Sequence, residues 1–277
     1  MKKAQIIIVG MGGQGVQTIA KILALAIVQN GCNVSYIPRF GVEQRGTPSV
    51  AFIKSDPDKI NYPLFNVADW LLILHPGARA EAAGYIDKKT QIIFDSSLMA
   101  ANQINGNLSN FFGLPAVKLA NDNFSGRSAN LIFLGKISKE LGLPFEVVWQ
   151  EMLKVLGKKF KSGAVKEEGR QALLAGYESS SEKGIFFQPT HQPSKGMINL
   201  KGGGKQLFLA PERCKGCGIC IVKCPVGAIK FGRRASAFAT PLPEVDLDKC
   251  NVCGNCFLYC PDGAIKVEKK NKKYGDN

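Results

Sequence analysis

Short apolar runs alternate with helical patterns over the first two thirds of the chain. Spacing typical of strands occurs in AQIIIVG, NVSYIP, SVAFIKS, DWLLILH, TQIIFDSS and PAVKLA. Apolar residues at helical spacing predict one helix from about Gln14 to Asn30 and another through GARAEAAGYI. Strands of this apolar character, separated by helices, are typical of an α/β domain whose parallel sheet is covered on both faces.

Three further helices are predicted before the pattern changes. They lie in SANLIFLGKISKELG, PFEVVWQEMLKVLGKKF and EEGRQALLAGYES, with Pro144 at a helix start. The following stretch is rich in Ser, Gly, Pro and Lys, as connecting segments are, although GIFF and MINL within it favour anchoring contacts. We therefore expect a first domain over residues 1–180, a linker arm over 181–205 and a second domain over 206–277.

The last part of the chain contains an internal repeat. CKGCGICIVKCPVGAIK begins at Cys214 and CNVCGNCFLYCPDGAIK begins at Cys250, so equivalent cysteines lie 36 positions apart. Each copy has the spacing C-x2-C-x2-C-x3-C-P, in which the first three cysteines suit three corners of an iron-sulfur cubane. The alternative is structural zinc, which leaves the third cysteine of each copy and both Cys-Pro dipeptides unexplained.

This spacing resembles that of bacterial ferredoxins with two 4Fe-4S clusters. The resemblance implies a small α+β domain in which the fourth cysteine of each copy reaches the cluster of the other copy. It assigns Cys214, Cys217, Cys220 and Cys260 to one cluster, and Cys250, Cys253, Cys256 and Cys224 to the second. Clusters of this kind carry single electrons and do no bond chemistry on an organic substrate.

A glycine-rich loop joins the first predicted strand to the first predicted helix. Its sequence GMGGQG fits G-x-G-x-x-G, with which Rossmann-like domains hold a pyrophosphate at a helix N-terminus. NAD binding needs an acidic residue at the end of the second strand, and none stands before Glu43. The basic loop PRFGVEQRGTP suits instead a ligand with an additional phosphate, either NADP or coenzyme A. The candidate ligand-binding residues are Gly12, Gly13, Gln14, Gly15, Arg39, Glu43 and Arg45.

The charged residues of the basic loop have a second interpretation. Arg39, Glu43 and Arg45 could form only an ion network that stabilises the loop, or a subunit contact. In the same way, the glutamines of the glycine loop and first helix could simply be helix-start residues. The sequence leaves these interpretations open.

Three segments together resemble the gamma subunit of 2-oxoacid:ferredoxin oxidoreductases, the pyruvate:ferredoxin oxidoreductase superfamily: GMGGQG, PRFGVEQRG and SANLIFLG. The cysteine repeat resembles the delta subunit of these enzymes, so the chain is identified as a fusion of the two. The resemblance implies alpha and beta partner subunits that hold thiamine diphosphate and magnesium, oxidise a 2-oxoacid and pass electrons singly through the clusters to ferredoxin or a similar acceptor. It also implies a coenzyme A site shared with a partner.

Two features of the sequence bear on this resemblance. The chain has no G-D-G motif followed by a distant Asn, the thiamine diphosphate signature, so we expect this chain alone to be non-catalytic. Gamma subunits read Y-G-x-E-x-R-G-G, whereas Phe40 and Thr47 stand at the first and last of these positions here. A relative acting on a substrate that needs no coenzyme A, such as oxalate, is therefore an open alternative.

A second functional class is an NADP-linked iron-sulfur oxidoreductase that uses the glycine loop by itself. Such an enzyme needs a flavin or a similar group to convert a hydride into single electrons. The sequence contains no distinct second nucleotide motif for that group. We therefore keep this class as the alternative.

Composition changes this picture only slightly. Of 277 residues 45% are apolar, and eight of the nine cysteines lie from Cys214 to Cys260, which indicates metal ligation in a reducing compartment. No apolar run reaches the roughly 18 residues that span a bilayer, so we expect a cytoplasmic protein. The net charge of +14 comes without a nucleic-acid-binding motif. We expect this charge to face acidic partner subunits or a polyphosphate ligand, or to form a solvated lysine-rich face.

Overall fold

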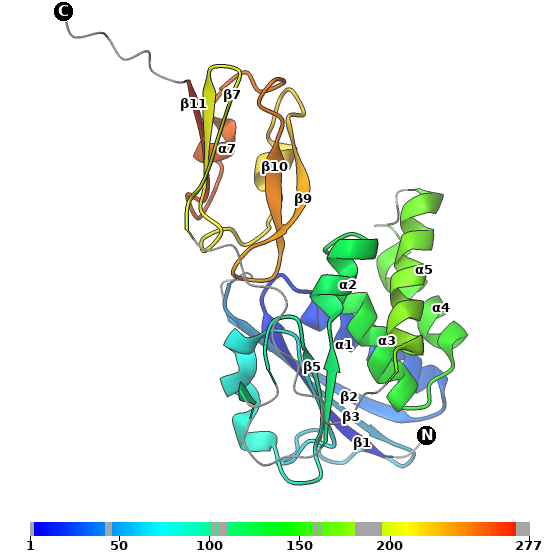
Figure 1. Cartoon of the computed structure of the whole chain (residues 1–277). Helices are drawn as coiled ribbons and strands as arrows, with labels where there is room; N and C mark the ends of the chain where they lie inside the picture. The colour runs from blue at the N-terminus through cyan, green and yellow to red at the C-terminus, as the bar shows by residue number, and fades with distance from the viewer. Residues whose placement is uncertain are drawn as a thin grey trace, which may run out of the picture. The chain divides into compact units, whose positions relative to one another are not determined.

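The computed structural model describes residues 3–41, 46–100, 103–104, 110–157, 160, 162–180 and 196–269 (Figure 1). The chain divides into two compact units, Met1–His191 and Gln192–Asn277. Each unit has a hydrophobic core of its own. None of the described helices has the length and apolar character needed to cross a bilayer.

A six-stranded sheet forms the centre of the first unit, in the order β2-β3-β1-β4-β5-β6. Its strands are β1 (Ala4–Met11), β2 (Asn33–Phe40), β3 (Pro48–Asp56), β4 (Trp70–Ile73), β5 (Gln91–Asp95) and β6 (Phe111–Leu114). β1, β4, β5 and β6 run parallel, whereas β3 runs antiparallel to both β1 and β2. The predicted parallel sheet is therefore a mixed one. Residues 41–47 between β2 and β3 are too few for the crossover that parallel neighbours need.

The helices of the first unit lie largely where the sequence predicts them. They are α1 (Val16–Gln29), the 3₁₀ helix η1 (Pro76–Tyr85), α2 (Ala116–Asn123), α3 (Ala129–Glu140), α4 (Phe145–Leu156) and α5 (Gly163–Glu178). PAVKLA, predicted as a strand, instead forms the start of α2, and the strand is β6 just before it. A six-residue run is too short to separate the two periodicities, and Pro115 at its start is a helix-start signal.

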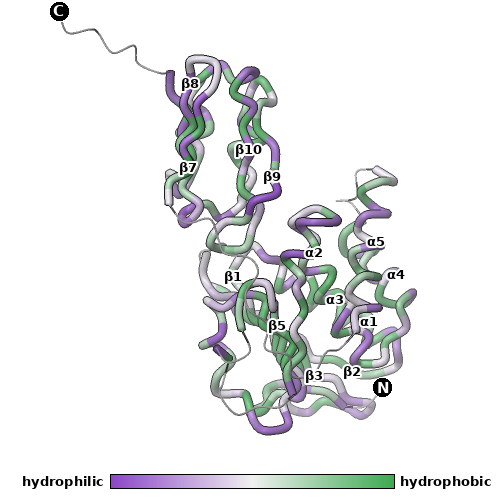
Figure 2. Tube along the Cα trace, in the orientation of Figure 1, coloured by the Kyte–Doolittle hydropathy of each residue, from purple (hydrophilic) through white to green (hydrophobic). Residues whose placement is uncertain are grey.

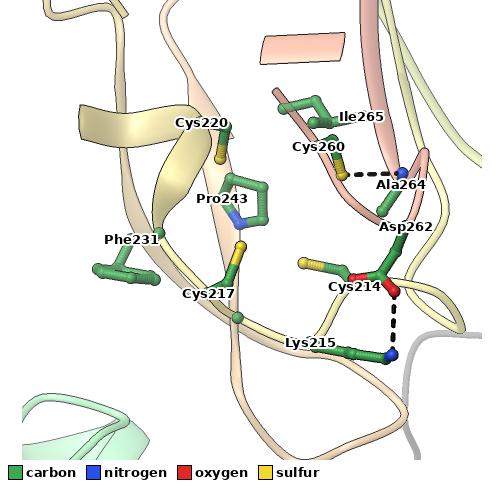
Figure 3. A pocket seen from close by; sticks show the side chains of 12 residues that line it. Cys214, Lys215, Cys217, Cys220, Phe231, Pro243, Cys260, Asp262, Ala264 and Ile265 are labelled. Atoms are coloured by element: carbon green, nitrogen blue, oxygen red, sulfur yellow. Dashed lines mark hydrogen bonds and ion pairs between the residues drawn. The ribbon is translucent and has the colours of Figure 1, made fainter. Parts of the chain in front are cut away.

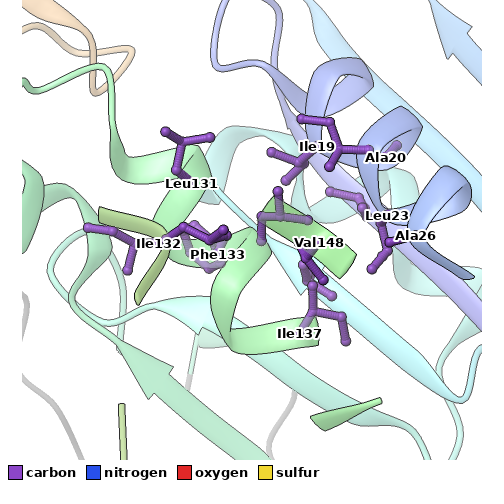
Figure 4. Close-up of a cluster of buried hydrophobic side chains, with 14 of the residues drawn as sticks. Ile19, Ala20, Leu23, Ala26, Leu131, Ile132, Phe133, Ile137 and Val148 are labelled. Atoms are coloured by element: carbon purple, nitrogen blue, oxygen red, sulfur yellow. The ribbon is translucent and has the colours of Figure 1, made fainter. Parts of the chain in front are cut away.

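Different elements cover the two faces of the sheet. Ile6 and Ile8 of β1 belong to the cluster in which α1, α3 and α4 pack together, and Figure 4 shows the side chains of these helices pointing toward one another. Ile7 and Val9 alternate with them and are equally buried, and η1 packs against β1, β3 and β4. Figure 2 shows the resulting concentration of hydrophobic positions in the central strands. β1 is therefore buried on both faces, as AQIIIVG predicts.

Helices α3 and α5 approach so closely that their backbones touch at two glycines. A Cβ atom added at Gly176 of α5 would lie 1.9 Å from the carbonyl oxygen of Ile132. One added at Gly135 of α3 would lie 2.1 Å from the carbonyl oxygen of Leu173. Both distances are far below van der Waals contact, so this helix pair requires glycine at both positions.

A fully buried carboxyl group joins the end of β5 to the start of α2. Oδ2 of Asp95 accepts a hydrogen bond of 2.9 Å from the backbone N–H of Val117, and Oδ1 accepts one of 2.9 Å from that of Ser97. Burial raises the pKa of Asp95 to about 6 from its ordinary value of 3.8, although these hydrogen bonds oppose the rise. The folded chain therefore holds this proton to a higher pH than the unfolded chain does.

Asp95→Asn is expected to destabilise the first unit by about 1–3 kcal/mol at neutral pH. The amide nitrogen of Asn would face one of the two N–H donors, and that donor would lose its acceptor in a buried position. The carboxyl group also contributes stability that is present below about pH 3.8 and is lost as the pH rises through about 6. Chemical denaturation of both proteins from pH 4 to 7 should show this loss in the native protein only; an identical pH dependence in the variant contradicts it.

The second unit is built from two copies of one pattern, a strand, a cysteine loop, a short helix and a second strand. The first copy comprises β8 (Lys205–Leu209), α6 (Ile219–Val222) and β9 (Ile229–Ala235), and the second β10 (Pro241–Val245), α7 (Asn255–Leu258) and β11 (Ile265–Lys269). The strands pair crosswise, because β8 pairs with β11 and β9 with β10. The duplication therefore extends beyond the cysteine motif to the strands on either side.

One further strand, β7 (Ile198–Gly202), pairs with β8. It lies among residues 181–205, which the sequence assigns to the linker arm, and it includes most of MINL. GIFF lies outside the described residues. The small core below these strands includes Leu207, Leu209 and Ile265 together with Cys220 and Cys256. A core of this size is marginal by itself, so groups bound by the cysteines would add to the stability of the unit.

Candidate metal centre

Eight cysteines line two separate pockets of the second unit. Cys214, Cys217, Cys220 and Cys260 line a pocket of about 380 Å³, a volume that includes open solvent (Figure 3). Cys224, Cys250, Cys253 and Cys256 line another, of about 310 Å³ by the same measure. Each set combines three cysteines of one copy with the fourth cysteine of the other. The crosswise strand pairing produces this exchange, because it places the end of each copy beside the start of the other.

Left-handed backbone conformations shape the cysteine loops. Gly218 and Gly254, at equivalent positions before α6 and α7, have φ angles of 74° and 81°. Gly216 also has a positive φ, and a Cβ atom there would lie 2.6 Å from the side chain of Thr240. Its counterpart Val252 has a φ of 57°, which is strained for a β-branched residue. The second loop therefore keeps the same path without the help of glycine at this position.

Backbone N–H groups point at the sulfur atoms in the same way in both copies. Ala228 donates to Sγ of Cys224 and Ala264 to Sγ of Cys260, each over 3.2 Å. Val252 donates to Sγ of Cys250 over 3.4 Å. Hydrogen bonds of this kind stabilise negative charge on sulfur, and they tune the potential of an iron-sulfur cluster.

The thiols of the first set are hard to ionise by themselves. Burial raises the pKa of Cys214 to about 11 and that of Cys220 to about 12, and neighbouring thiols raise both as well. Burial also raises the pKa of Cys256 in the second set. Four thiolates can gather in such a pocket only around a positively charged metal core, which deprotonates them on binding. The donor sets therefore fit a metal cluster.

The geometry fits a cluster better than a single metal ion. Among the described residues, no three His, Cys, Asp or Glu side chains converge as ligands of one ion. A structural zinc ion needs its four ligands within about 2.3 Å of one point. Each set of cysteines instead combines three residues at the C-x2-C-x2-C spacing with the fourth cysteine of the other copy, the ligand pattern of a cubane.

The glycine loop lies against the C-terminal end of the basic loop, at Gly46 and Thr47. The N–H of Gly12 donates to the carbonyl oxygen of Thr47 over 2.7 Å, and the N–H of Gly46 donates to that of Gly12 over 3.3 Å. Gln14 folds back, so that its Oε1 accepts from the N–H of Met11 over 2.8 Å. The residue before α1 is Gly15, which has a φ of 80° and leaves the start of the helix without a side-chain cap. Gly13 also has a positive φ. The hydrogen bonds of Gly12 bring the glycine loop and the basic loop together.

Arg39 has partners within the first unit. Its guanidinium forms an ion pair of 2.8 Å with Glu81 of η1 and lies 5.4 Å from the centre of the Phe52 ring. The partner of Arg39 is thus Glu81, a residue outside the Arg39, Glu43 and Arg45 network that the sequence suggests. Glu43 and Arg45 lie outside the described residues.

Sequence reasoning missed two charged residues beside the first pocket. Nζ of Lys215 lies 3.0 Å from Oδ1 of Asp262, and both residues line the pocket with Cys214 and Cys260. A comparison of the two copies at the offset of 36 residues would have revealed them, because their counterparts Asn251 and Val226 are uncharged.

Comparisons with known proteins identify both domains of the chain. The sequence family described as "Pyruvate ferredoxin/flavodoxin oxidoreductase" matches residues 5–179. The chain belongs to this family. In this oxidoreductase chain, the family described as "4Fe-4S dicluster domain" matches residues 213–275, so a ferredoxin-like 4Fe-4S domain follows the oxidoreductase domain. The predicted combination of gamma-type and ferredoxin-type sequence in one chain is confirmed.

Similar proteins include subunits of 2-oxoacid oxidoreductases. The 2-oxoglutarate synthase subunit KorC of Archaeoglobus fulgidus is 34% identical over 148 residues, which cover 53% of the oxidoreductase chain and 75% of that protein. The pyruvate synthase subunit PorC of Methanothermobacter marburgensis is 27% identical over 179 residues, covering 63% and 96%. The gamma subunit of a keto/oxoacid ferredoxin oxidoreductase from Geobacter sulfurreducens shares the fold, with a TM-score of 0.51 and 21% identity over 63% of this chain and 96% of that chain.

Proposed function

We propose that this chain is the electron-transfer and coenzyme A-covering subunit of a thiamine diphosphate-dependent 2-oxoacid:ferredoxin oxidoreductase. The observation that carries the proposal is the union of an oxidoreductase-family domain with a ferredoxin-like domain whose eight cysteines form two sets of four. The similar subunits from Archaeoglobus and Methanothermobacter are named for 2-oxoglutarate and pyruvate. The substrate class is therefore a 2-oxoacid.

In this proposal each set of cysteines holds one 4Fe-4S cluster. Cys214, Cys217, Cys220 and Cys260 hold the first cluster, and Cys224, Cys250, Cys253 and Cys256 hold the second. When bound, the clusters supply one-electron transfer. The chain contributes the thiolates, the backbone N–H groups directed at sulfur and partial shielding from water.

The chemistry on the 2-oxoacid belongs to partner subunits in this proposal. The chain has no thiamine diphosphate signature, and both similar proteins above are named as subunits. Alpha and beta partners would hold thiamine diphosphate and magnesium, and ferredoxin or a similar carrier would accept the electrons. The relatives give no support to the alternative of an NADP-linked enzyme.

The test is iron analysis and turnover on the whole chain, purified without oxygen. We expect about eight irons per chain. The chain alone should not oxidise 2-oxoacids in the presence of thiamine diphosphate and magnesium, and addition of the alpha and beta subunits should give reduction of ferredoxin. Zinc in place of iron contradicts the cluster assignment. Oxidation of a 2-oxoacid by the single chain contradicts the proposal that partner subunits carry out this reaction.

We place coenzyme A at the glycine loop and the basic loop, in a site shared with a partner subunit. Hydrogen bonds of Gly12 with Gly46 and Thr47 support this placement, because they hold both loops together at the N-terminus of α1. Backbone N–H groups at a helix N-terminus and arginine side chains both suit phosphate oxygens. Phe40 and Thr47 depart from the gamma-subunit pattern, so an enzyme that needs no coenzyme A is the competing outcome of the test.

Arg45→Ala in the assembled complex is expected to weaken coenzyme A binding by about 1.5–3 kcal/mol, the loss of one charged hydrogen bond. Isothermal titration or the apparent affinity during turnover measures this, and electron transfer through the clusters should be unchanged. Lys88→Ala is a matched control, because it also removes one positive charge. Lys88 lies before the amino end of β5, whereas the glycine loop follows the carboxyl end of β1, which runs parallel to β4 and β5. Unchanged coenzyme A affinity in both Arg39 and Arg45 variants, or tight binding of NAD, would refute this placement.

A further inference from the structure

The two pockets are related by the repeat but differ in charge. The first contains Lys215 and Asp262 beside its cysteines. At the positions 36 residues away, the second copy has Asn251 where the first has Lys215, and Val226 stands where the equivalent of Asp262 would be. Residues lining the second pocket, apart from its cysteines, are uncharged. The duplication has therefore kept the ligands and changed their electrostatic surroundings.

The ion pair connects the two parts of the chain that make the first set of cysteines. Lys215 follows Cys214 directly, and Asp262 lies two residues beyond Cys260, the cysteine contributed by the other copy. The Nζ–Oδ1 distance is 3.0 Å, and the two side chains are only 23% and 21% exposed. Solvent screens such a pair less than it screens a pair on the surface.

The negative end of the pair is the end that acts on the sulfur atoms. Figure 3 shows the Asp262 carboxylate between the Cys214 sulfur and the Lys215 ammonium. An added electron near this carboxylate is therefore less stable than it would be beside an uncharged side chain.

The second pocket favours an added electron by comparison. Cys253 is exposed, whereas none of the four cysteines of the first pocket is. Solvent near Cys253 stabilises added negative charge, whereas the N–H groups directed at sulfur are alike in the two pockets and do not distinguish them. Solvent exposure, hydrogen bonds to sulfur and nearby charge are the factors that set cluster potentials.

We infer that the Lys215–Asp262 ion pair makes the two clusters unequal: it fastens the loop of Cys260 to the loop of Cys214, and its inner carboxylate keeps the reduction potential of the first cluster below that of the second. This inference rests on the proposed function, since it concerns the two proposed clusters. Electrons that enter the domain then come to rest on the second cluster, which is the one nearer to solvent through Cys253.

Redox titrations of the whole chain, followed by electron paramagnetic resonance, test the inference after iron analysis has established two clusters. Asp262→Asn should raise the lower of the two reduction potentials, and Lys215→Gln should lower it. The double variant Lys215→Asn with Asp262→Val, which copies the second pocket, should raise it by less than Asp262→Asn does. Val226→Asp is the matched control, and it should lower the higher potential instead.

The inference is overturned if the two single variants move the potential in the same direction, if both potentials move equally, or if neither moves. If Asp262→Asn loses the first cluster, the double variant Lys215→Asp with Asp262→Lys tests the inference instead. It keeps the ion pair but exchanges the positions of the two charges. That variant should retain the cluster and raise its potential; a lowered or unchanged potential overturns the inference. Absence of iron from the native chain instead defeats the proposed function itself.

Discussion

Cys224→Ser is expected to remove or damage the cluster held by Cys250, Cys253 and Cys256, and to leave intact the one nearer in sequence. The reason is that Cys224 lines the pocket of the second copy, although it belongs to the first. Iron content should fall from about eight to about four per chain, with loss of one of two reduction steps. Anaerobic iron analysis and electron paramagnetic resonance measure the change.

Two variants complete this experiment. Cys260→Ser should have the reciprocal effect, because Cys260 lines the pocket of Cys214, Cys217 and Cys220. Cys32→Ser should leave the iron content unchanged, because Cys32 is buried in the core of the first unit. Damage by Cys224→Ser to the cluster of Cys214 would show that each copy binds its own cluster, against the geometry of both pockets.

Gly176→Ala should destabilise the first unit by about 2 kcal/mol or more. The new methyl group would overlap the carbonyl oxygen, carbonyl carbon and Cα of Ile132, all backbone atoms that cannot move aside alone. Helices α3 and α5 would have to separate, and such overpacking costs about 1–3 kcal/mol or occasionally more. This cost exceeds the gain of about 1 kcal/mol that alanine brings over glycine within a helix. Urea denaturation of the whole chain, followed by circular dichroism, measures the loss.

Gly163→Ala is the matched control on the same helix. A Cβ atom at Gly163 meets no atom within 4 Å, so the substitution adds no overlap. The stability of this variant should equal or slightly exceed that of the native chain. Equal stabilities of the Gly176 and Gly163 variants would mean that the two helices can separate without loss, contrary to the close packing described for them.

The sequence predicts best those features that depend on local spacing. The cysteine repeat is visible because metal ligands need fixed distances along the chain, and α1 is visible because its buried residues keep helical spacing. The direction of β3 is a different matter, since β2 and β3 have the same apolar character in either orientation. The short loop between β2 and β3 is what indicates that they run antiparallel, and apolar patterning contains no information on loop length.

Contacts between distant residues could not be predicted in this way. The partner of Arg39 is Glu81, which lies 42 positions further on, and no local pattern connects the two. The close approach of Gly135 and Gly176 likewise depends on how α3 and α5 cross. Such features follow from tertiary packing, so the sequence indicates the residues without indicating their roles.

The crosswise pairing of β8 with β11 and of β9 with β10 has a consequence for the origin of the second unit. A chain with a single strand–loop–helix–strand copy would lose the pairing of its two strands with the other copy and would have a set of cysteines one short. Two identical chains could repair both defects by exchanging strands and the fourth cysteine about a two-fold axis. The second unit therefore has the arrangement that such a dimer would have, with its two copies joined in one polypeptide.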